Sequence, residues 1–303
     1  MPKKQEEFDV YEKDKFFENP FLKRFLEIPD CPEKVYTLGS FPDSHLHTLA
    51  IVGSRDISSY GKDVLEKIIS GLAGSSVCII SGLAIGVDGE AHRLALKHGI
   101  HTVAVPGSGL SYKAIYPKSN KEIAKKIVES GGLLLSELSP ETEAAPWTFP
   151  KRNRLMAALA DAVLVVEAGF KSGTLITARL ALEYNKDVLA VPGSVFSKGA
   201  EGTNNLIANG AKLVICADDI LECFGIFKVD STPEESQKQY AAKVLENLSD
   251  TEKEILSLIK EPISKDKIIS SSGKDAGDIL VTLTMLEWRG FIKEEGGIIR
   301  RVK

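Results

Sequence analysis

The stretch Leu49-Ala-Ile-Val-Gly-Ser-Arg55 joins a short apolar run to an exit of small residues and one arginine. The same pairing recurs downstream in Val77-Cys-Ile-Ile-Ser-Gly82. Nearly continuous apolarity over four or five residues is typical of strands that are buried on both faces, as in a parallel sheet. Runs of this kind predict strands at Leu49–Val52, Val77–Ile80, Thr102–Val105, Leu133–Leu135, Ala162–Val166, Val188–Val191 and Leu213–Ile215.

Helical patterns lie between these runs. Over Gly61–Gly74 the apolar residues fall on one face at helical spacing, and Lys121–Ser130 repeats the pattern. Regular alternation of strand and helix predicts an α/β protein with a doubly wound, mostly parallel and Rossmann-like sheet. We expect this domain to cover residues 36–224.

The two ends of the chain do not show this alternation of strand and helix patterns. Residues 1–35 are charged and aromatic without a clear period, as in an arm that docks on the main domain or a frayed terminus. Residues 225–245 have the composition of a linker. Beyond them, residues 246–303 predict a small winged-helix domain of three helices and a hairpin. Its expected elements are helices at Thr251–Ile259, Ser264–Ser270 and Ala276–Trp288, and strands at Phe291–Lys293 and Ile298–Arg301.

The third helix of this small domain is acidic. It carries Asp278 and Glu287, follows Asp275, and contains no lysine or arginine. A helix that reads duplex DNA needs cations or amides directed at bases and phosphates. The pattern therefore favours protein contact or internal packing over binding of duplex DNA.

Composition restricts the class of protein further. The 303 residues include 43% hydrophobic and 26% charged side chains, which excludes a disordered or fibrous chain. No apolar run approaches the ~20 residues that span a bilayer, and no secretory signal opens the chain. Four scattered cysteines without a CxxC pair argue against a disulfide scaffold or a zinc site and favour the cytoplasm. With a net charge of −4, nucleic acid would require a local basic patch.

Small residues follow nearly every predicted strand, at the edge where open α/β sheets bind ligands. The exits are Gly53-Ser54-Arg55, Ser81–Gly86, Pro106–Gly109, Lys171-Ser172-Gly173-Thr174 and Pro192–Ser194. Backbone N–H groups and helix N-termini at such exits favour anions. Glycines also close tight turns, but five such exits on one edge favour a phosphorylated ligand.

Motifs of cofactor enzymes are absent. GxGxxG does not follow the first strand and GxxxxGK[ST] does not occur, which disfavours a dehydrogenase and a Walker ATPase. Asp88 and His92 have the spacing of an acid–base pair, although a helix-capping Asp and a packed His explain them equally well. Glu137 and Glu167 end predicted strands, where catalytic carboxylates often lie. Neither has a second carboxylate or a metal-ligand cluster beside it in the sequence, which favours a hydrogen bond to local backbone or to an arginine. The sequence predicts no catalytic residue, no metal and no cofactor.

The densest basic cluster is Phe149-Pro-Lys-Arg-Asn-Arg154. Guanidinium groups pair with phosphates, and Phe149 offers a face on which a base can stack. The alternative is a basic first turn of a helix with salt bridges to acidic residues. Cations at a helix N-terminus oppose the macrodipole, which favours the anion-binding interpretation. Arg55 and Lys171 would extend the patch from neighbouring strand exits.

Several motifs, in register, resemble the DNA-processing protein A family, also called DprA or Smf. They are Gly53-Ser54-Arg55 with Ser59-Tyr60-Gly61, Ser81–His92, Tyr116–Asn120, Phe149–Arg154 and Ser172–Ala178. The likeness runs from about Pro32 to Ala217 and continues more weakly through the winged helix. It implies an extended Rossmann fold that binds single-stranded DNA, delivers it to the RecA recombinase in natural transformation, and forms a homodimer.

The resemblance also implies a set of site residues. In the family, the corresponding segments surround a DNA pocket, and their roles carry to the matching positions here. With their neighbours, the predicted DNA-binding residues are Gly53, Ser54, Arg55, Phe149, Lys151, Arg152, Asn153, Arg154, Lys171, Ser172, Gly173 and Thr174.

A second hypothesis is a nucleotide-processing enzyme similar to the phosphoribohydrolases once labelled lysine decarboxylases. Their Pro-Gly-Gly-x-Gly-Thr-x-x-Glu loop is echoed in Gly169-Phe-Lys-Ser-Gly-Thr174. The echo lacks the trailing Glu, because Thr177 and Ala178 occupy that stretch. The catalytic carboxylate of those enzymes is therefore missing.

Overall fold

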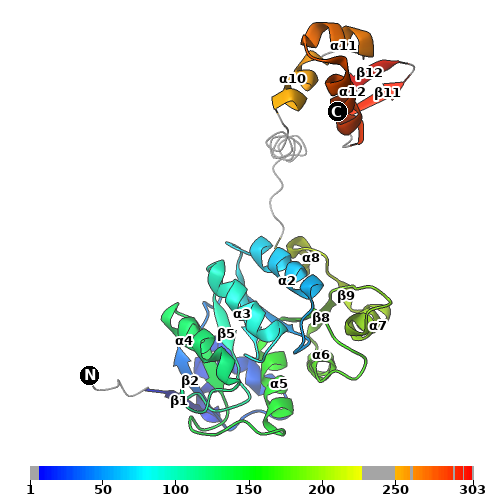
Figure 1. Cartoon of the computed structure of the whole chain (residues 1–303). Coiled ribbons are helices and arrows are strands. Elements are labelled where there is room, and N and C mark those ends of the chain that lie inside the picture. Colours follow the sequence, from blue (N-terminus) through cyan, green and yellow to red (C-terminus); the bar gives the residue numbers. More distant parts are fainter. Residues whose placement is uncertain (1–6, 227–249, 260–261, 289–290, 296, 302–303) are drawn as a thin grey trace. The chain divides into compact units, whose positions relative to one another are not determined.

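The computed structural model describes residues 7–226, 250–259, 262–288, 291–295 and 297–301 (Figure 1). The chain divides into two compact units, Met1–Ile226 and Phe227–Lys303, which we describe separately. Most of the expected linker, residues 225–245, lies outside the described residues.

A nine-stranded sheet forms the centre of the first unit, in the order β1-β2-β6-β5-β4-β3-β7-β8-β9. Strands β3 to β9 pair in parallel where they are neighbours, whereas β2 runs antiparallel to both β1 and β6. The predicted fold class, a doubly wound and mostly parallel α/β sheet, is confirmed. The strands are β1 (Asp9–Glu12), β2 (Lys34–Gly39), β3 (His47–Val52), β4 (Val77–Ser81), β5 (Thr102–Ala104), β6 (Leu133–Ser136), β7 (Ala162–Val165), β8 (Asp187–Ala190) and β9 (Lys212–Leu213).

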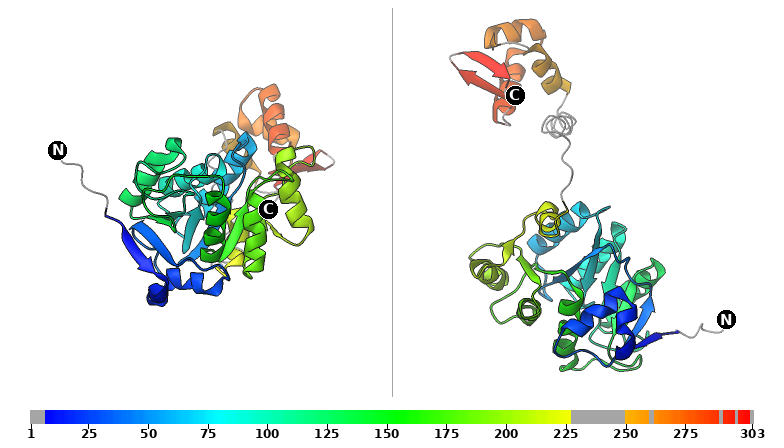
Figure 2. Two further views of the ribbon diagram at one scale, coloured as in Figure 1. Left: turned by 90° about the horizontal axis from the view of Figure 1, so that it is seen from below. Right: turned by 180° about the vertical axis from the view of Figure 1, so that it is seen from behind.

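Helices cover both faces of this sheet (Figures 1 and 2). Alternate residues of β3 face opposite layers: Ala50 and Val52 pack with α5 and α6, whereas Leu49 and Ile51 pack with α2, α3 and α8. The helices are α1 (Pro20–Lys23), α2 (Ser59–Gly71), α3 (Val87–Lys97), α4 (Lys121–Glu129), α5 (Thr148–Leu159), α6 (Thr174–Glu183), α7 (Glu201–Ala208) and α8 (Ala217–Cys223), with 3-10 turns η1 (Lys13–Glu18), η2 (Arg24–Glu27), η3 (Lys118–Asn120) and η4 (Lys198–Ala200).

The strand order reverses between β3 and β7, which are parallel neighbours with Val52 opposite Val165. From β3 the chain continues outward through β4, β5 and β6, and from β7 it continues the other way through β8 and β9. Loops that leave the two central strands therefore diverge and open a crevice at their carboxyl ends. Open α/β sheets bind ligands at such a switch point.

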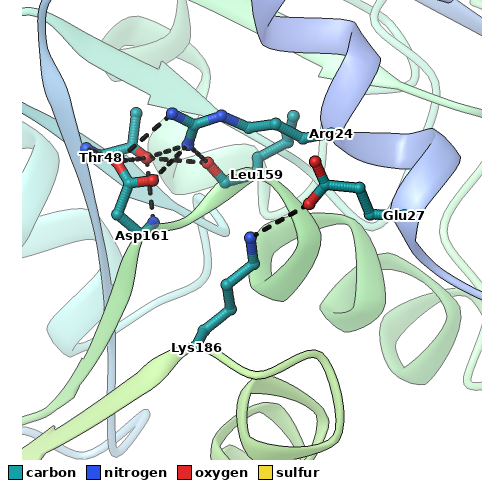
Figure 3. Close-up of polar contacts among 6 residues, drawn as sticks. All are labelled: Arg24, Glu27, Thr48, Leu159, Asp161 and Lys186. Carbon is teal, nitrogen blue, oxygen red and sulfur yellow. Dashed lines mark hydrogen bonds and ion pairs between the residues drawn. The ribbon is translucent and has the colours of Figure 1, made fainter.

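The N-terminal segment packs into the core. Phe16, Leu22 and Phe25 are fully buried in the layer that contains α5 and α6. Figure 3 shows how this segment is held: Arg24 bonds Thr48 and the carbonyl of Leu159 and pairs with Asp161, while Glu27 pairs with Lys186. Strands β1 and β2 continue the sheet on the far side of β6. Residues 9–39 thus belong structurally to the large unit.

The second unit is the predicted winged helix. A hairpin with a short third strand gives the antiparallel order β10-β12-β11, and Ile255, Ile268, Ile279 and Ile299 meet in its core. Its elements are α10 (Asp250–Leu258), β10 (Ile263–Ser264), α11 (Lys265–Ser272), α12 (Ala276–Trp288), β11 (Ile292–Glu295) and β12 (Ile298–Arg301). In the described parts of both units, every helix is too short or too polar to cross a membrane.

Candidate nucleic-acid interface

A cavity of about 520 Å³ opens at the switch point between β3 and β7. It is lined by the exit of β3, the start of α3, the first turns of α5 and the loop that begins α6. Eight of the twelve predicted residues line it: Gly53, Arg55, Phe149, Arg152, Asn153, Ser172, Gly173 and Thr174. We call this the switch-point cavity.

The cavity contains a buried arginine in its wall. Arg152 is 7% exposed, and its Nη1 donates hydrogen bonds to the carbonyl oxygens of Gly82 and Val105. A Cβ on Gly82 would overlap the guanidinium, so only glycine allows this close approach. The carbonyls hold the guanidinium in place at the exit of β4. A fixed, desolvated cation of this kind favours an anionic ligand.

Asp88 stands next to this cation. It is buried and accepts a hydrogen bond from the backbone N–H of Gly82 at 3.1 Å. Burial raises the pKa of Asp88, although the nearby charge of Arg152 acts against that shift. Burial likewise lowers the pKa of Arg152, and the carboxylate of Asp88 opposes it. The two side chains therefore stabilise each other's charged forms.

The mouth of the cavity combines a second cation with an aromatic ring. The exposed Arg55 lies over Phe149, with its guanidinium carbon 5.2 Å from the ring centroid. The ring of Tyr116 lies 5.9 Å from that of Phe149, and Tyr116 is 48% exposed. Sequence reasoning assigned no site role to Tyr116. Only its membership of a family motif pointed to it.

The loop before α6 closes the opposite wall. Thr174 Oγ1 donates to the carbonyl of Gly53 at 3.0 Å, and Thr174 N donates to Ser172 Oγ at 3.2 Å. Helix α6 begins at Thr174 and has no acidic residue in its first turn. Its N-terminus therefore adds a partial positive charge to the same cavity.

Three further predicted residues do not line the cavity. Ser54 Oγ bonds the backbone of Asp56 within its own turn. Lys151 is exposed and lies 4.0 Å from a carboxylate oxygen of Glu137. Lys171 is exposed in the loop before α6. The structure places these residues outside the lining and leaves the roles of the two lysines toward DNA as predictions.

Arg154 requires a correction. Its guanidinium pairs with Glu137 and with Asp30 at 2.8 Å, and its side chain is only 7% exposed. The reason is helical geometry: residues two positions apart on α5 project about 200° apart, so Arg152 and Arg154 cannot share one cavity. The structure assigns Arg154 to an internal ion-pair cluster.

The spacing of Asp88 and His92 does not produce an acid–base pair. His92 Nδ1 bonds Thr102 Oγ1 at 2.8 Å, whereas Asp88 bonds Gly82. Complete burial lowers the pKa of His92 to about 3. His92 is therefore a neutral core residue. Glu167 also has a local partner, because it accepts hydrogen bonds from the backbone and hydroxyl of Ser58.

Comparison with known proteins shows the family to which this chain belongs. A family model described as DNA recombination-mediator protein A matches residues 14–225. The chain belongs to this DprA/Smf family. Protein Smf from Escherichia coli is 35% identical over 285 residues, covering 91% of this chain and 74% of that protein.

Two solved structures of DprA proteins share the fold. That from Streptococcus pneumoniae superposes with a TM-score of 0.66 and 37% identity, covering 71% of this chain and 74% of that one. DprA from Helicobacter pylori, whose structure is described for its single-stranded DNA binding mode, gives a TM-score of 0.62 and 30% identity, over 72% and 95% of the two chains. The sequence-based assignment to the DprA family is confirmed.

Proposed function

We propose that this member of the DprA family binds single-stranded DNA in the switch-point cavity without cleaving it. The observation that carries the proposal is the convergence of Arg55, Arg152 and Phe149 on one cavity. The relative from Helicobacter pylori supports it, since that protein binds single-stranded DNA.

In this proposal, different residues of the cavity bind the phosphates and the bases of the strand. Arg152 and the N-terminus of α6 receive a phosphate, while Arg55 neutralises the next phosphate at the mouth. Phe149 and Tyr116 offer ring faces to bases. A base must leave its stack to reach such a recessed surface, which favours a single strand over a duplex.

We propose a binding role and not an enzymatic one, as family members are recombination mediators. Among the described residues, the only carboxylate that lines the cavity is Asp88, which faces Arg152 and bonds Gly82. Thr177 lines the cavity near the position of the Glu that the phosphoribohydrolases use. Glycosidic hydrolysis needs a carboxylate free to act on the sugar or base.

We further propose that the protein acts in the cytoplasm and delivers the bound strand to RecA. We also propose that it forms a homodimer. Strand β9 (Lys212–Leu213) ends the nine-stranded sheet; Leu213 in the strand and Ile215 just after it are 43% and 54% exposed. An open edge with apolar side chains is a template for pairing with a second copy. Light scattering is expected to give a dimer, and Leu213→Lys a monomer. A monomeric parent chain would contradict this part.

The binding claim is tested with the full chain by salt-titrated fluorescence anisotropy on a single strand, its duplex and a mononucleotide. We expect the single strand to bind most tightly, with a salt slope of about −0.7 per phosphate contacted. Equal affinity for all three would contradict the proposal. Release of free base from nucleoside monophosphates would instead support the phosphoribohydrolase hypothesis.

A further inference from the structure

Two of the family motifs meet beside the switch-point cavity. One supplies the loop of residues 82–86 that follows β4, which we call the β4 loop, and the other ends at Asn120, the last residue of η3. Asn120 Nδ2 donates hydrogen bonds to the carbonyl oxygens of Leu83 and Ala84, both at 2.9 Å. Asn120 is 2% exposed, and Ala84 lines the cavity. A single buried amide therefore holds two consecutive carbonyls of the β4 loop.

The position of Asn120 in the chain would suit a different role. Asn120 is the N-cap residue of α4, where an asparagine side chain commonly accepts a hydrogen bond from the first turn. In the described first turn of α4, no backbone N–H donates to the Asn120 side chain, which bonds the β4 loop instead. The contact with this loop, and not helix capping, therefore accounts for the amide.

The β4 loop has a backbone conformation that needs support. Leu83 has a φ of 58° and is fully buried. A non-glycine residue seldom adopts this left-handed region, and such conformations persist only where the surrounding structure holds them. Asn120 bonds the carbonyl of Leu83 itself, and the carbonyl of Ala84 also accepts from Gly89 N at 2.9 Å. Asn120 thus helps to hold a conformation that the loop's own residues disfavour.

The two ends of the β4 loop contact the two arginines of the cavity. At one end, the carbonyl of Gly82 accepts a hydrogen bond from Arg152 Nη1. At the other end, a Cβ on Gly86 would lie 2.6 Å from the carbonyl carbon of Arg55, so glycine lets the loop pack directly on that backbone. A shift of this loop would therefore move both arginines.

The two arginines need such a support because they repel each other. Arg55 and Arg152 both line the cavity. Burial lowers the pKa of Arg152, and the charge of Arg55 adds to that shift against the opposing charge of Asp88. Two like charges stay together before a ligand arrives only where the fold holds them. A site that is fixed in advance loses less free energy on binding.

We infer that Asn120 is a positioning residue for DNA binding: by holding the β4 loop, it keeps Arg152 and the backbone of Arg55 in place for the phosphates of a strand. Asn120 is not among the described residues that line the cavity, so it acts through the loop and not by touching DNA. This inference rests on the proposed binding of single-stranded DNA.

The test compares Asn120→Ser with the parent chain by anisotropy on oligothymidylate, at a temperature where circular dichroism shows both chains folded. Serine is also a favourable N-cap residue, but its side chain is too short to bond both carbonyls. We expect binding to weaken about tenfold, as for one misplaced contact between a guanidinium and a phosphate. Asn204→Ser is the matched control. Asn204 makes two hydrogen bonds with the backbone of Gly193, in a loop outside the cavity lining, and its loss should leave affinity unchanged.

A double-mutant cycle separates positioning from a general effect on the fold. Arg152→Lys keeps a positive charge beside Asp88 but removes the planar guanidinium that the β4 loop holds. In this background, Asn120→Ser should weaken binding by less than about threefold, because the group that it positions is gone. An equal loss in both backgrounds would show that Asn120 does not act through Arg152 and would overturn the inference.

A second variant keeps the test valid if Asn120→Ser does not fold. Gly89 lies in α3, and a Cβ there would lie 2.8 Å from Asn120 Nδ2. Gly89→Ala favours the helix but displaces the amide, so we expect severalfold weaker binding, and a smaller effect in Arg152→Lys. Parent-level affinity in whichever of the two variants folds would overturn this inference alone. Absence of single-strand binding by the parent chain would overturn the proposed function.

Discussion

The guanidinium of Arg55 lies over the ring of Phe149, 5.2 Å from its centroid. The two residues come from segments almost a hundred positions apart, and they meet only because β3 and α5 deliver them to the same cavity. A cation over a ring is a modest attraction at an exposed site, about 0.5–1 kcal/mol. The interaction therefore places a positive charge beside an aromatic face, but it is too weak to fix the conformation of either side chain. A base that stacks on the face now covered by Arg55 must displace the guanidinium toward the phosphates.

Removing the exposed cation should weaken DNA binding and its salt dependence together. We expect Arg55→Ala to cost about 1–3 kcal/mol of single-strand affinity and to reduce the salt slope by about 0.7, the share of one phosphate. Anisotropy titrations at several salt concentrations measure both quantities. Arg93→Ala, at an arginine whose partner is Glu90 on the surface of α3, is the matched control. An unchanged slope in Arg55→Ala would remove Arg55 from the site.

Removing the ring should weaken binding without changing the salt slope. We expect Phe149→Ala to cost about 1–3 kcal/mol if a base stacks there, because stacking releases no counterions. A double-mutant cycle with Arg55→Ala adds a sharper criterion. Since Arg55 and Phe149 are in contact, the two losses should be non-additive by at least about 0.5 kcal/mol. Strict additivity would mean that the two side chains act separately.

Arg154 should matter for stability and not for binding. Replacing it by Met leaves Glu137, whose side chain is 10% exposed, without its main partner, which we expect to cost about 3 kcal/mol of unfolding free energy. The double variant Arg154→Met, Glu137→Leu removes both charges and should recover most of that loss. Urea unfolding measures the stability, and anisotropy at a temperature where both variants are folded measures affinity. A large loss of single-strand affinity in the stable double variant would show that Arg154 contributes to DNA binding.

The neutral, buried His92 should make the fold sensitive to acid. Its pKa is lowered from 6.5 to about 3, so the unfolded chain binds a proton more readily than the folded one as the pH falls. Its contribution to stability is complete above about pH 7.5 and declines toward pH 3. Between pH 7.5 and pH 5 the expected loss is about 2 kcal/mol.

His92→Gln keeps a polar partner for Thr102 and removes the titration. Its unfolding free energy should therefore change less with pH than that of the parent chain. His101, whose burial also lowers its pKa, contributes in the same direction in both proteins. Parallel pH profiles for the two chains would show that His92 does not carry the effect.

The parallel strands β3 to β8 were predictable because each contains a run of buried, mostly apolar residues. Strands β1 and β2 were not, for a physical reason: β1 is mostly exposed, and β2 alternates buried and exposed residues next to a loop-rich segment. Their place in the sheet depends on pairing with β6 and on the aromatic core of the N-terminal segment. Such long-range packing leaves little local signal.

The site was predictable in part. The small residues that follow the strands correctly located the candidate site at the carboxyl edge of the sheet. The basic cluster identified α5 as an element that contributes to it. The sequence did not show where α5 begins, so it did not show which of the cluster's cations face the cavity and which face away from it. In the structure Pro150 occupies the first turn of α5, where proline is tolerated. Once Thr148 is taken as the start, helical spacing alone separates Arg152 from Arg154.

Photo-crosslinking tests directly whether DNA contacts the switch-point cavity, as we propose. A single strand carrying 5-iodouracil, which couples to aromatic rings stacked on it, is irradiated with the full chain, and the attached peptide is identified by mass spectrometry. The account predicts attachment at Phe149 or Tyr116, and loss of the Phe149 product in Phe149→Leu. Attachment confined to the winged helix, residues 262–301, would contradict it.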